Sequence, residues 1–259
     1  MALTGKTVAN TFKDILQIDN SNAGIPTSLK VVKDGLGNQA SLYISDDQIK
    51  IQPENDDTTT LLEINDKDGD QMLVIDSTND AVKVFSQNVN TQYVYFGTSS
   101  TDSLPASANT HTAIPFGNVL GSSADVTFGT GTNPATSLTV SATADDLVSV
   151  LWFVPDDITI DGVTVWAAGS ASSGDVIKFH LMSYSIVRTD GATCGDLSSG
   201  TVIADGSNIT HDGYEQADYQ ELTIQSADIS GSKVLLFMIH SDGTNSDYSI
   251  NATIKYHLR

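Results

Sequence analysis

A run of short, weakly apolar strands between residues 40 and 85 most constrains what this chain can fold into. Apolar and polar residues alternate there, as in half-buried strands, and the strand starts recur about every ten residues. Polar segments rich in Asp, Asn and Ser separate the strands, including Asp66-Lys67-Asp68-Gly69-Asp70, which we interpret as a hairpin turn and not as a calcium loop. The predicted strands are 41–44, 49–52, 60–65, 71–76 and 81–85.

Each of these strands offers few inward apolar side chains. Ordering a residue costs roughly 1–2 kcal/mol, so five such strands in one chain cannot close a core. Two or three copies wrapped about one axis could close one, so we expect residues 39–90 to form a short intertwined β stalk of a homotrimer. The expected inward pairs are Leu42 and Ile44, Ile49 and Ile51, Leu62 and Ile64, Met72 and Val74, and Val82 and Val84.

Residues 119–259 have the pattern of a separate all-β domain. Eight to ten strands punctuated by Gly, Asn and Asp indicate a β sandwich or jelly roll. The near-continuous apolar runs 147–154 and 234–239 predict central strands. Between the stalk and this domain, residues 91–118 are rich in Ser and Thr and are predicted to be a connector that contains a short strand at 93–96.

One local signal predicts a hairpin in the second domain. Asp161-Gly162 suits a two-residue turn that would pair 158–160 with 163–165. The Ile and Val side chains would then face the core, and Trp166 would face away from it. His180 alternates with Lys178 and Tyr184, so all three are expected on the solvent face of their strand.

Residues 1–38 are polar and interrupted by Gly and Asn, with helically spaced apolar residues around 7–17. The stretch GKTVANTFKDILQIDNSN (5–22), then VKDG (32–35), LYIS (42–45) and IKIQ (49–52), resembles the N-terminal region of fibre-like structural proteins of tailed bacteriophages. This resemblance covers roughly residues 5–85 and implies attachment to a virion through the N-terminal segment. The expected anchor residues are Val8, Phe12, Ile15, Leu16 and Ile18.

The net charge of the chain argues against nucleic-acid binding. The chain carries a formal net charge of −20, so it lacks the basic footprint of a nucleic-acid-binding protein. No apolar run is long enough to span a bilayer, and no secretory signal is evident. We expect a soluble protein that is assembled in a host cytoplasm, is carried on the virion and does not insert into membranes.

Catalytic and metal-binding patterns do not occur in the sequence. There is no nucleophile elbow, no Gly-rich phosphate loop and no His spacing typical of metal ligands. We therefore expect no enzymatic activity, no metal and no cofactor. The residues that could bind a ligand or fill a subunit interface are aromatic: Trp166, Tyr184, Tyr214 and Tyr219.

We therefore expect a fibre that is fixed by its N-terminus to tail or capsid proteins and displays a C-terminal domain. Host-surface glycan is its expected partner. Two alternatives stay open. In the first, the chain is a capsid-bound head fibre or decoration protein without receptor binding. In the second, it is a polysaccharide-degrading tail spike. A spike would need a long repetitive β-helix with clustered carboxylates, and the stalk of this chain is short.

Overall fold

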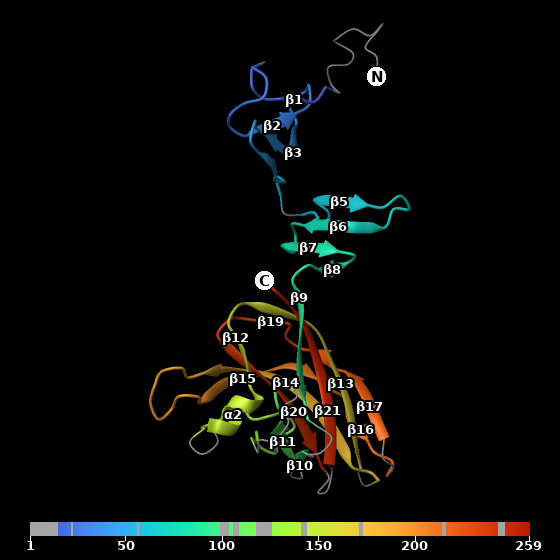
Figure 1. Cartoon of the computed structure of the whole chain (residues 1–259), viewed down its shortest axis with the longest axis vertical. Helices are drawn as coiled ribbons and strands as arrows, with labels where there is room; N and C mark the ends of the chain where they lie inside the picture. Colours follow the sequence, from blue (N-terminus) through green and yellow to red (C-terminus); the bar gives the residue numbers. More distant parts are fainter. Residues whose placement is uncertain are drawn as a thin grey trace. The chain divides into compact units, whose positions relative to one another are not determined.

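The chain forms two units of almost entirely β structure, Met1–Val89 and Asn90–Arg259 (Figure 1). The computed structural model describes residues 15–21, 23–55, 57–98, 104–105, 109–117, 126–140, 144–170, 173–213, 216–242 and 247–259. The predicted helix around residues 7–17 lies largely outside these ranges. All strand pairs in the described part are antiparallel, and none of its peptide bonds is cis.

The first sheet of the N-terminal unit has four strands in chain order: β1 (Gln17–Ile18), β2 (Lys30–Lys33), β3 (Gln39–Ile44) and β4 (Ile49–Ile51). Leu42 lies opposite Ile51 and Ile44 opposite Ile49, so these four side chains share one face, as predicted. The predicted boundary between residues 38 and 39 is wrong, because β2 pairs with β3 across it.

The second sheet of this unit contains β5 (Leu62–Asn65), β6 (Gln71–Asp76), β7 (Ala81–Val84) and β8 (Gln87–Asn88). Its register joins six apolar side chains on one face: Leu62, Ile64, Leu73, Ile75, Val82 and Val84. The expectation that Met72 and Val74 belong to this face is wrong. The apolar run 72–75 fits either alternation, and pairing with the neighbouring strands selects Leu73 and Ile75.

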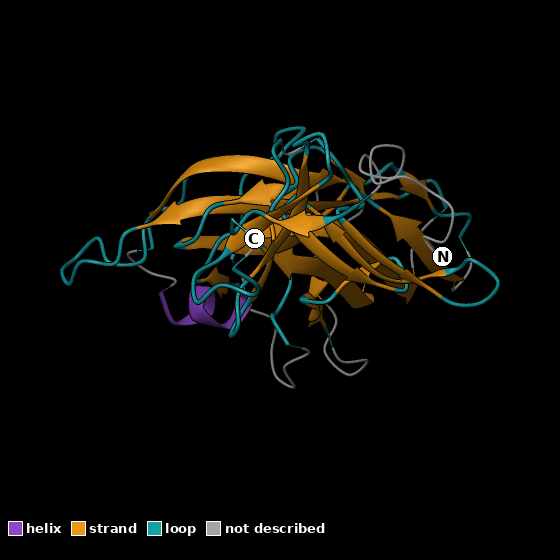
Figure 2. Cartoon of the chain, turned by 90° about the horizontal axis from the view of Figure 1, so that it is seen from above, coloured by secondary structure: helices purple, strands orange, loops and turns teal. Residues whose placement is uncertain are grey.

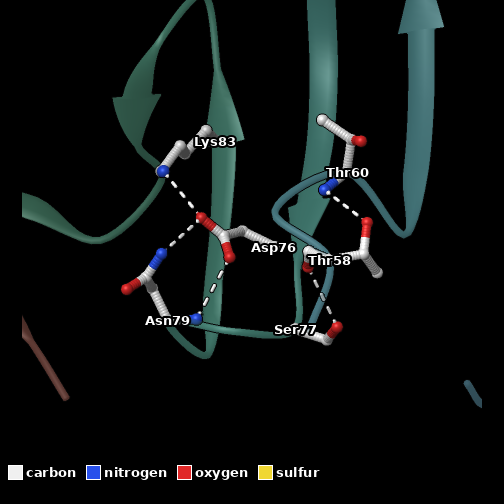
Figure 3. Close-up of polar contacts among 6 residues, drawn as sticks. All are labelled: Thr58, Thr60, Asp76, Ser77, Asn79 and Lys83. Carbon is white, nitrogen blue, oxygen red and sulfur yellow. Dashed lines mark hydrogen bonds and ion pairs between the residues drawn. The ribbon is translucent and has the colours of Figure 1, made fainter. Parts of the chain in front are cut away.

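The carboxylates of Asp66 and Asp76 accept hydrogen bonds that stabilise two turns of this sheet. Asp66 Oδ1 accepts hydrogen bonds from the backbone N–H groups of Asp68 and Asp70, and Gly69 takes a positive φ of 93°, which confirms the predicted turn. Asp76 is buried and accepts hydrogen bonds from the backbone and side-chain amides of Asn79 (Figure 3). Its Oδ2 also lies 3.0 Å from Lys83 Nζ.

One sheet of the C-terminal unit has six strands. Its central strands β21 (Asp247–Leu258) and β13 (Ile158–Ser170) pair with each other, and β17 (Gln216–Glu221) and β19 (Asp228–Ile229) extend the sheet beyond β13. β9 (Thr91–Gly97) and β10 (Leu104–Pro105) pair with the other edge of β21. The short strand predicted at 93–96 is therefore confirmed as part of β9, but it belongs to this sheet and not to a connector (Figure 1).

The second sheet of this unit has seven strands. At its centre β14 (Val176–Ile186) pairs with β20 (Lys233–Ser241). β11 (Thr110–Ala113) and β12 (Trp152–Val154) complete one side. The other side consists of β15 (Leu197–Asp205), β16 (Ile209–Thr210) and β18 (Thr223–Ile224).

The two sheets pack face to face around one hydrophobic core. It joins the inner faces of the central strands, and the fully buried rings of Phe179 and Phe237 stack with their centroids 5.8 Å apart. This arrangement is sandwich-like, and the predicted central strand 234–239 is confirmed as part of β20. The core members also include Phe96, Ile160, Val163, Val165, Leu181, Ile239, Ile250 and Ile254.

A second core covers the outer face of the seven-stranded sheet. It consists of the helix α2 (Ala144–Val150), apolar residues from the segment 126–140 and side chains of β14 and β20. Leu147 and Val150, one helical turn apart, are buried there, while Val148 is exposed. Figure 2 shows this helix to one side of the strand layers. The prediction of one central strand over 147–154 is wrong, because the run divides into α2 and the edge strand β12.

The predicted Asp161-Gly162 hairpin is also wrong, since β13 runs through it as one strand. Against β21, Ile160 pairs with Tyr256 and Gly162 with Lys255, which leaves Asp161 as an extra residue. Such a bulge shifts the alternation by one residue, as the hairpin would have done. Ile160 and Val163 therefore both face the core, and the prediction that Trp166 faces away from it is confirmed.

We expect Phe237→Ala to lower the free energy of unfolding of the C-terminal unit by about 3–5 kcal/mol, because it leaves a cavity beside Phe96 and Phe179. Phe153→Ala, on a partly exposed edge-strand ring, serves as the control and should cost less than about 1 kcal/mol. Urea unfolding of both variants measures the difference. Equal losses would contradict the assignment of the core.

Candidate functional site

An exposed aromatic pair lies on the outer face of the six-stranded sheet. Trp166 on β13 pairs directly with Tyr219 on β17, and their ring centroids are 4.9 Å apart. Trp166 is 56% exposed and Tyr219 is 49% exposed. The Tyr219 hydroxyl donates a hydrogen bond to Glu221 Oε1 over 2.8 Å, which raises the pKa of this tyrosine and fixes its ring. The structure thus brings together two of the four predicted aromatic candidates.

Two further aromatic residues, which the sequence prediction missed, share this face. Tyr93 and Tyr95 project from β9, where Tyr95 pairs with Thr253 and Tyr93 with Lys255. Both tyrosines are about half exposed. Thr253 pairs in turn with Thr164 of β13, so the register places β9, β21 and β13 side by side on one surface. The alternation in Tyr93-Val94-Tyr95-Phe96 predicts a short strand, but it does not show which strand it pairs with or that its tyrosines join this face.

The middle of this face is polar. Between the two aromatic pairs, β21 presents Asn251, Thr253 and Lys255, and β13 presents Thr164. Asn251 is exposed and the other three are partly buried. The surface therefore offers amide, hydroxyl and ammonium groups between two aromatic ends.

The other predicted site residues lie elsewhere. Tyr184 is completely buried in the second core, donates a hydrogen bond to the Ala135 carbonyl over 2.8 Å and has a pKa raised by burial. The expectation that Tyr184 is exposed is therefore wrong, because α2 and the segment 126–140 cover the face that its alternation with Lys178 correctly predicts. Tyr214 lies outside the described residues.

The predicted anchor residues are only partly described. Val8 and Phe12 lie outside the described ranges. Ile15 and Leu16 are exposed, and Ile18 pairs with Val32 as part of β1.

A buried histidine cluster occupies the same outer face of the seven-stranded sheet as Tyr184. His111, His240 and Lys178 form one row across β11, β20 and β14, and His180 pairs with Asp205 in the next row. The expectation that His180 faces solvent is wrong, because it is fully buried. The ring of His111 lies 5.0 Å from that of His180 and 4.6 Å from that of His240.

Polar contacts surround this cluster. His180 Nδ1 lies 3.0 Å from Asp205 Oδ1, and Lys178 Nζ forms an ion pair with the same carboxylate, donating a hydrogen bond to its Oδ2 over 3.0 Å. His111 Nε2 lies 2.8 Å from the Gly131 carbonyl oxygen. No group of three or more His, Cys, Asp or Glu residues within the described ranges is arranged to hold a metal ion.

Burial disfavours the protonated form of these imidazoles. It lowers the pKa of His180 to about 4, against the opposing attraction of Asp205. Burial also lowers the pKa of His111, against its bond to Gly131, and that of His240, against the nearby Asp242. Lys178 adds positive charge that disfavours all three protonated forms.

Comparisons with known proteins add no relatives. No family model and no curated protein matches the sequence. In the described part of the chain, no helix has the length and apolar content to cross a membrane. Function is therefore inferred from the surfaces of the two units.

We expect the C-terminal unit to lose stability as the pH falls from about 6.5 to about 4. The unfolded chain takes up more protons on these histidines in that interval than the folded chain does, so the unfolded state is favoured as the pH falls. His180 alone contributes on the order of 3 kcal/mol, since its pKa is lowered from 6.5 to about 4.

Urea unfolding at several pH values measures this dependence. His180→Gln should flatten it whatever the absolute stability of the variant. His257→Gln, outside the cluster on β21, serves as the control and should keep the steep dependence. A wild-type stability that is constant between pH 6.5 and 4 would contradict the proposed neutral cluster.

Proposed function

We propose that this chain is a structural subunit of a tailed bacteriophage: an oligomeric fibre that attaches through its N-terminal unit and displays its C-terminal sandwich for adhesion to the host surface. The observation that carries the proposal is the contrast between the two units. The C-terminal unit has two closed cores, whereas the sheets of the N-terminal unit leave their apolar faces open. The resemblance of residues 5–85 to phage fibre proteins supports the same assignment.

The open face of the second N-terminal sheet is best completed by further copies of this chain. Six aliphatic side chains form it, and Ile64, Val82 and Val84 are exposed. The opposite face carries the charged Glu63, Lys83 and buried Asp76 beside Met72 and Val74, so it is the more polar of the two. A small sheet of this kind is stable only when its hydrophobic face is covered. In the single chain, Val32 and Val74 are the buried large apolar residues of the described N-terminal unit.

The first sheet repeats this arrangement. Leu42, Ile44, Ile49 and Ile51 share one face, and Ile49 is 74% exposed. Two consecutive sheets with open apolar faces fit a stalk in which two or three chains intertwine about one axis, and we propose three.

The displayed unit fits an adhesion role. Its cores are closed within one chain, so it needs no partner to stay folded. We further propose that it is of jelly-roll type, since strands far apart in sequence are neighbours, such as β13 with β21 and β14 with β20. An array of such units would multiply weak contacts through avidity.

We expect sedimentation of the purified chain to show a homotrimer, and Ile64→Asp to weaken its association by roughly tenfold or more, because it places a charge on the covered face. Met72→Asp is the matched control. Met72 is 42% exposed and Ile64 is 47% exposed, but Met72 lies on the opposite face of the sheet. A wild-type monomer at micromolar concentration, or equal effects of the two substitutions, would contradict the proposed stalk.

The virion assignment has its own test. Antibodies against residues 90–259, visualised by electron microscopy, should label regularly placed projections on the phage particles that carry this protein. Labelling on the tail would support host adhesion, whereas labelling over the whole capsid would favour a head fibre or decoration protein. Particles without label, from a lysate that contains the protein, would refute the virion role.

A further inference from the structure

The outer face of the six-stranded sheet combines two aromatic ends with a polar centre. Tyr93 and Tyr95 lie at the β9 edge, and Trp166 and Tyr219 lie on β13 and β17. Four neighbouring strands at ~4.8 Å spacing place the outermost rings roughly 14 Å apart across the sheet. A single small molecule cannot reach both ends, but an extended chain can.

The distribution of polarity argues against a protein partner. Protein interfaces have an apolar centre surrounded by a polar rim. Here the order is reversed, because Asn251, Thr253 and Thr164 occupy the centre and the rings lie outside them. A ligand that stacks on rings at intervals and hydrogen-bonds between them fits better. Chains of pyranose sugars have flat apolar faces and equatorial hydroxyl groups, and so they meet both requirements.

The charge of the protein indicates which class of sugar chain fits this face. The protein carries a net charge of −20, and Glu221 lies beside Tyr219 on this face. Lys255 is the cation that the paired strands place there. An acidic protein repels sialylated, uronate-rich or phosphorylated glycans, so an uncharged chain is favoured.

We propose that this face binds an extended uncharged oligosaccharide, with sugar rings stacked on Trp166 and Tyr219 at one end and on Tyr93 and Tyr95 at the other. This inference rests on the proposed role in host-surface adhesion and names the ligand class for it. Asn251, Thr253 and Thr164 supply hydrogen bonds between the two stacking positions. The Glu221 carboxylate holds the Tyr219 ring in place through the tyrosine hydroxyl.

The test uses the full-length protein on an array of oligosaccharides built from neutral hexoses and N-acetylhexosamines, beside sialylated and phosphorylated counterparts. We expect binding to neutral chains of several residues and not to monosaccharides. Trp166→Ala and Tyr95→Ala should each weaken binding on the order of tenfold, since each removes one stacking position. Phe153→Ala serves as the control, because it removes an exposed ring from the other sheet of the same unit.

Tryptophan fluorescence gives an independent readout. The chain has two tryptophans, of which Trp152 is buried and Trp166 exposed. A bound neutral oligosaccharide should shield Trp166 from quenching by acrylamide, and the same sugar should have no effect in Trp166→Ala. Sedimentation of each variant separates this proposal from the fibre role, because neither substitution lies in the N-terminal sheets.

Several outcomes would overturn the proposal. Absence of binding to any neutral chain would do so, as would undiminished binding by both variants or a preference for anionic glycans. Loss of the oligomer in Trp166→Ala would identify the face as a subunit interface instead. If the oligomer persists and sugar binding is absent, the fibre role stands and the ligand assignment fails.

Discussion

The pairing of β14 with β20 is the interaction on which the C-terminal unit depends. Every residue from Val234 to Ile239 is buried, because one face of the sheet packs on the six-stranded sheet and the other is covered by α2 and the segment 126–140. A strand buried on both faces cannot alternate apolar and polar residues. The same double burial places Tyr184 and His180 inside, where the Tyr184 hydroxyl donates a hydrogen bond to the Ala135 carbonyl and His180 Nδ1 lies 3.0 Å from the Asp205 carboxylate.

A single extra residue in β13 determines which side chains of the six-stranded sheet face outward. Without the bulge at Asp161, regular alternation from Ile158 and Ile160 would turn Trp166 into the core and Val163 out of it. The bulge also positions the Asp161 carboxylate 2.9 Å from His257 Nδ1 on the neighbouring strand. The exposed aromatic face thus depends on a backbone irregularity as much as on the aromatic residues themselves.

Local patterns predicted strands well and long-range relationships poorly. The run 234–239 is too apolar for any surface element, and its central position could be predicted from that alone. The division of the equally apolar run 147–154 into two elements could not be predicted. Leu147 and Val150 have the spacing of a buried helix face, while Trp152 and Val154 have the alternation of a strand. Tyr184, His180 and Lys178 do share one face, as alternation predicts. That this face is covered depends on distant residues such as Ala135, 49 positions before Tyr184, which no local pattern reveals. Trp166 and Tyr219 were identified, but Tyr93 and Tyr95 become part of the same surface only through pairing with β21, far along the chain.

The C-terminal unit offers a surface for weak sugar contacts, and the N-terminal unit has open apolar faces that favour association. The proposed function requires both. A flat, solvent-exposed sheet face excludes little water, so each sugar contact on it would be weak. An intertwined stalk that gathers three copies would present three such faces together, and linked weak sites bind far more tightly than single ones. The N-terminal sheets gain stability only when their open apolar faces meet, so the association that completes their fold would also supply the multivalency that the exposed aromatic face requires. On this view, the scarcity of core residues between positions 40 and 85 is the feature that makes adhesion through the sandwich effective.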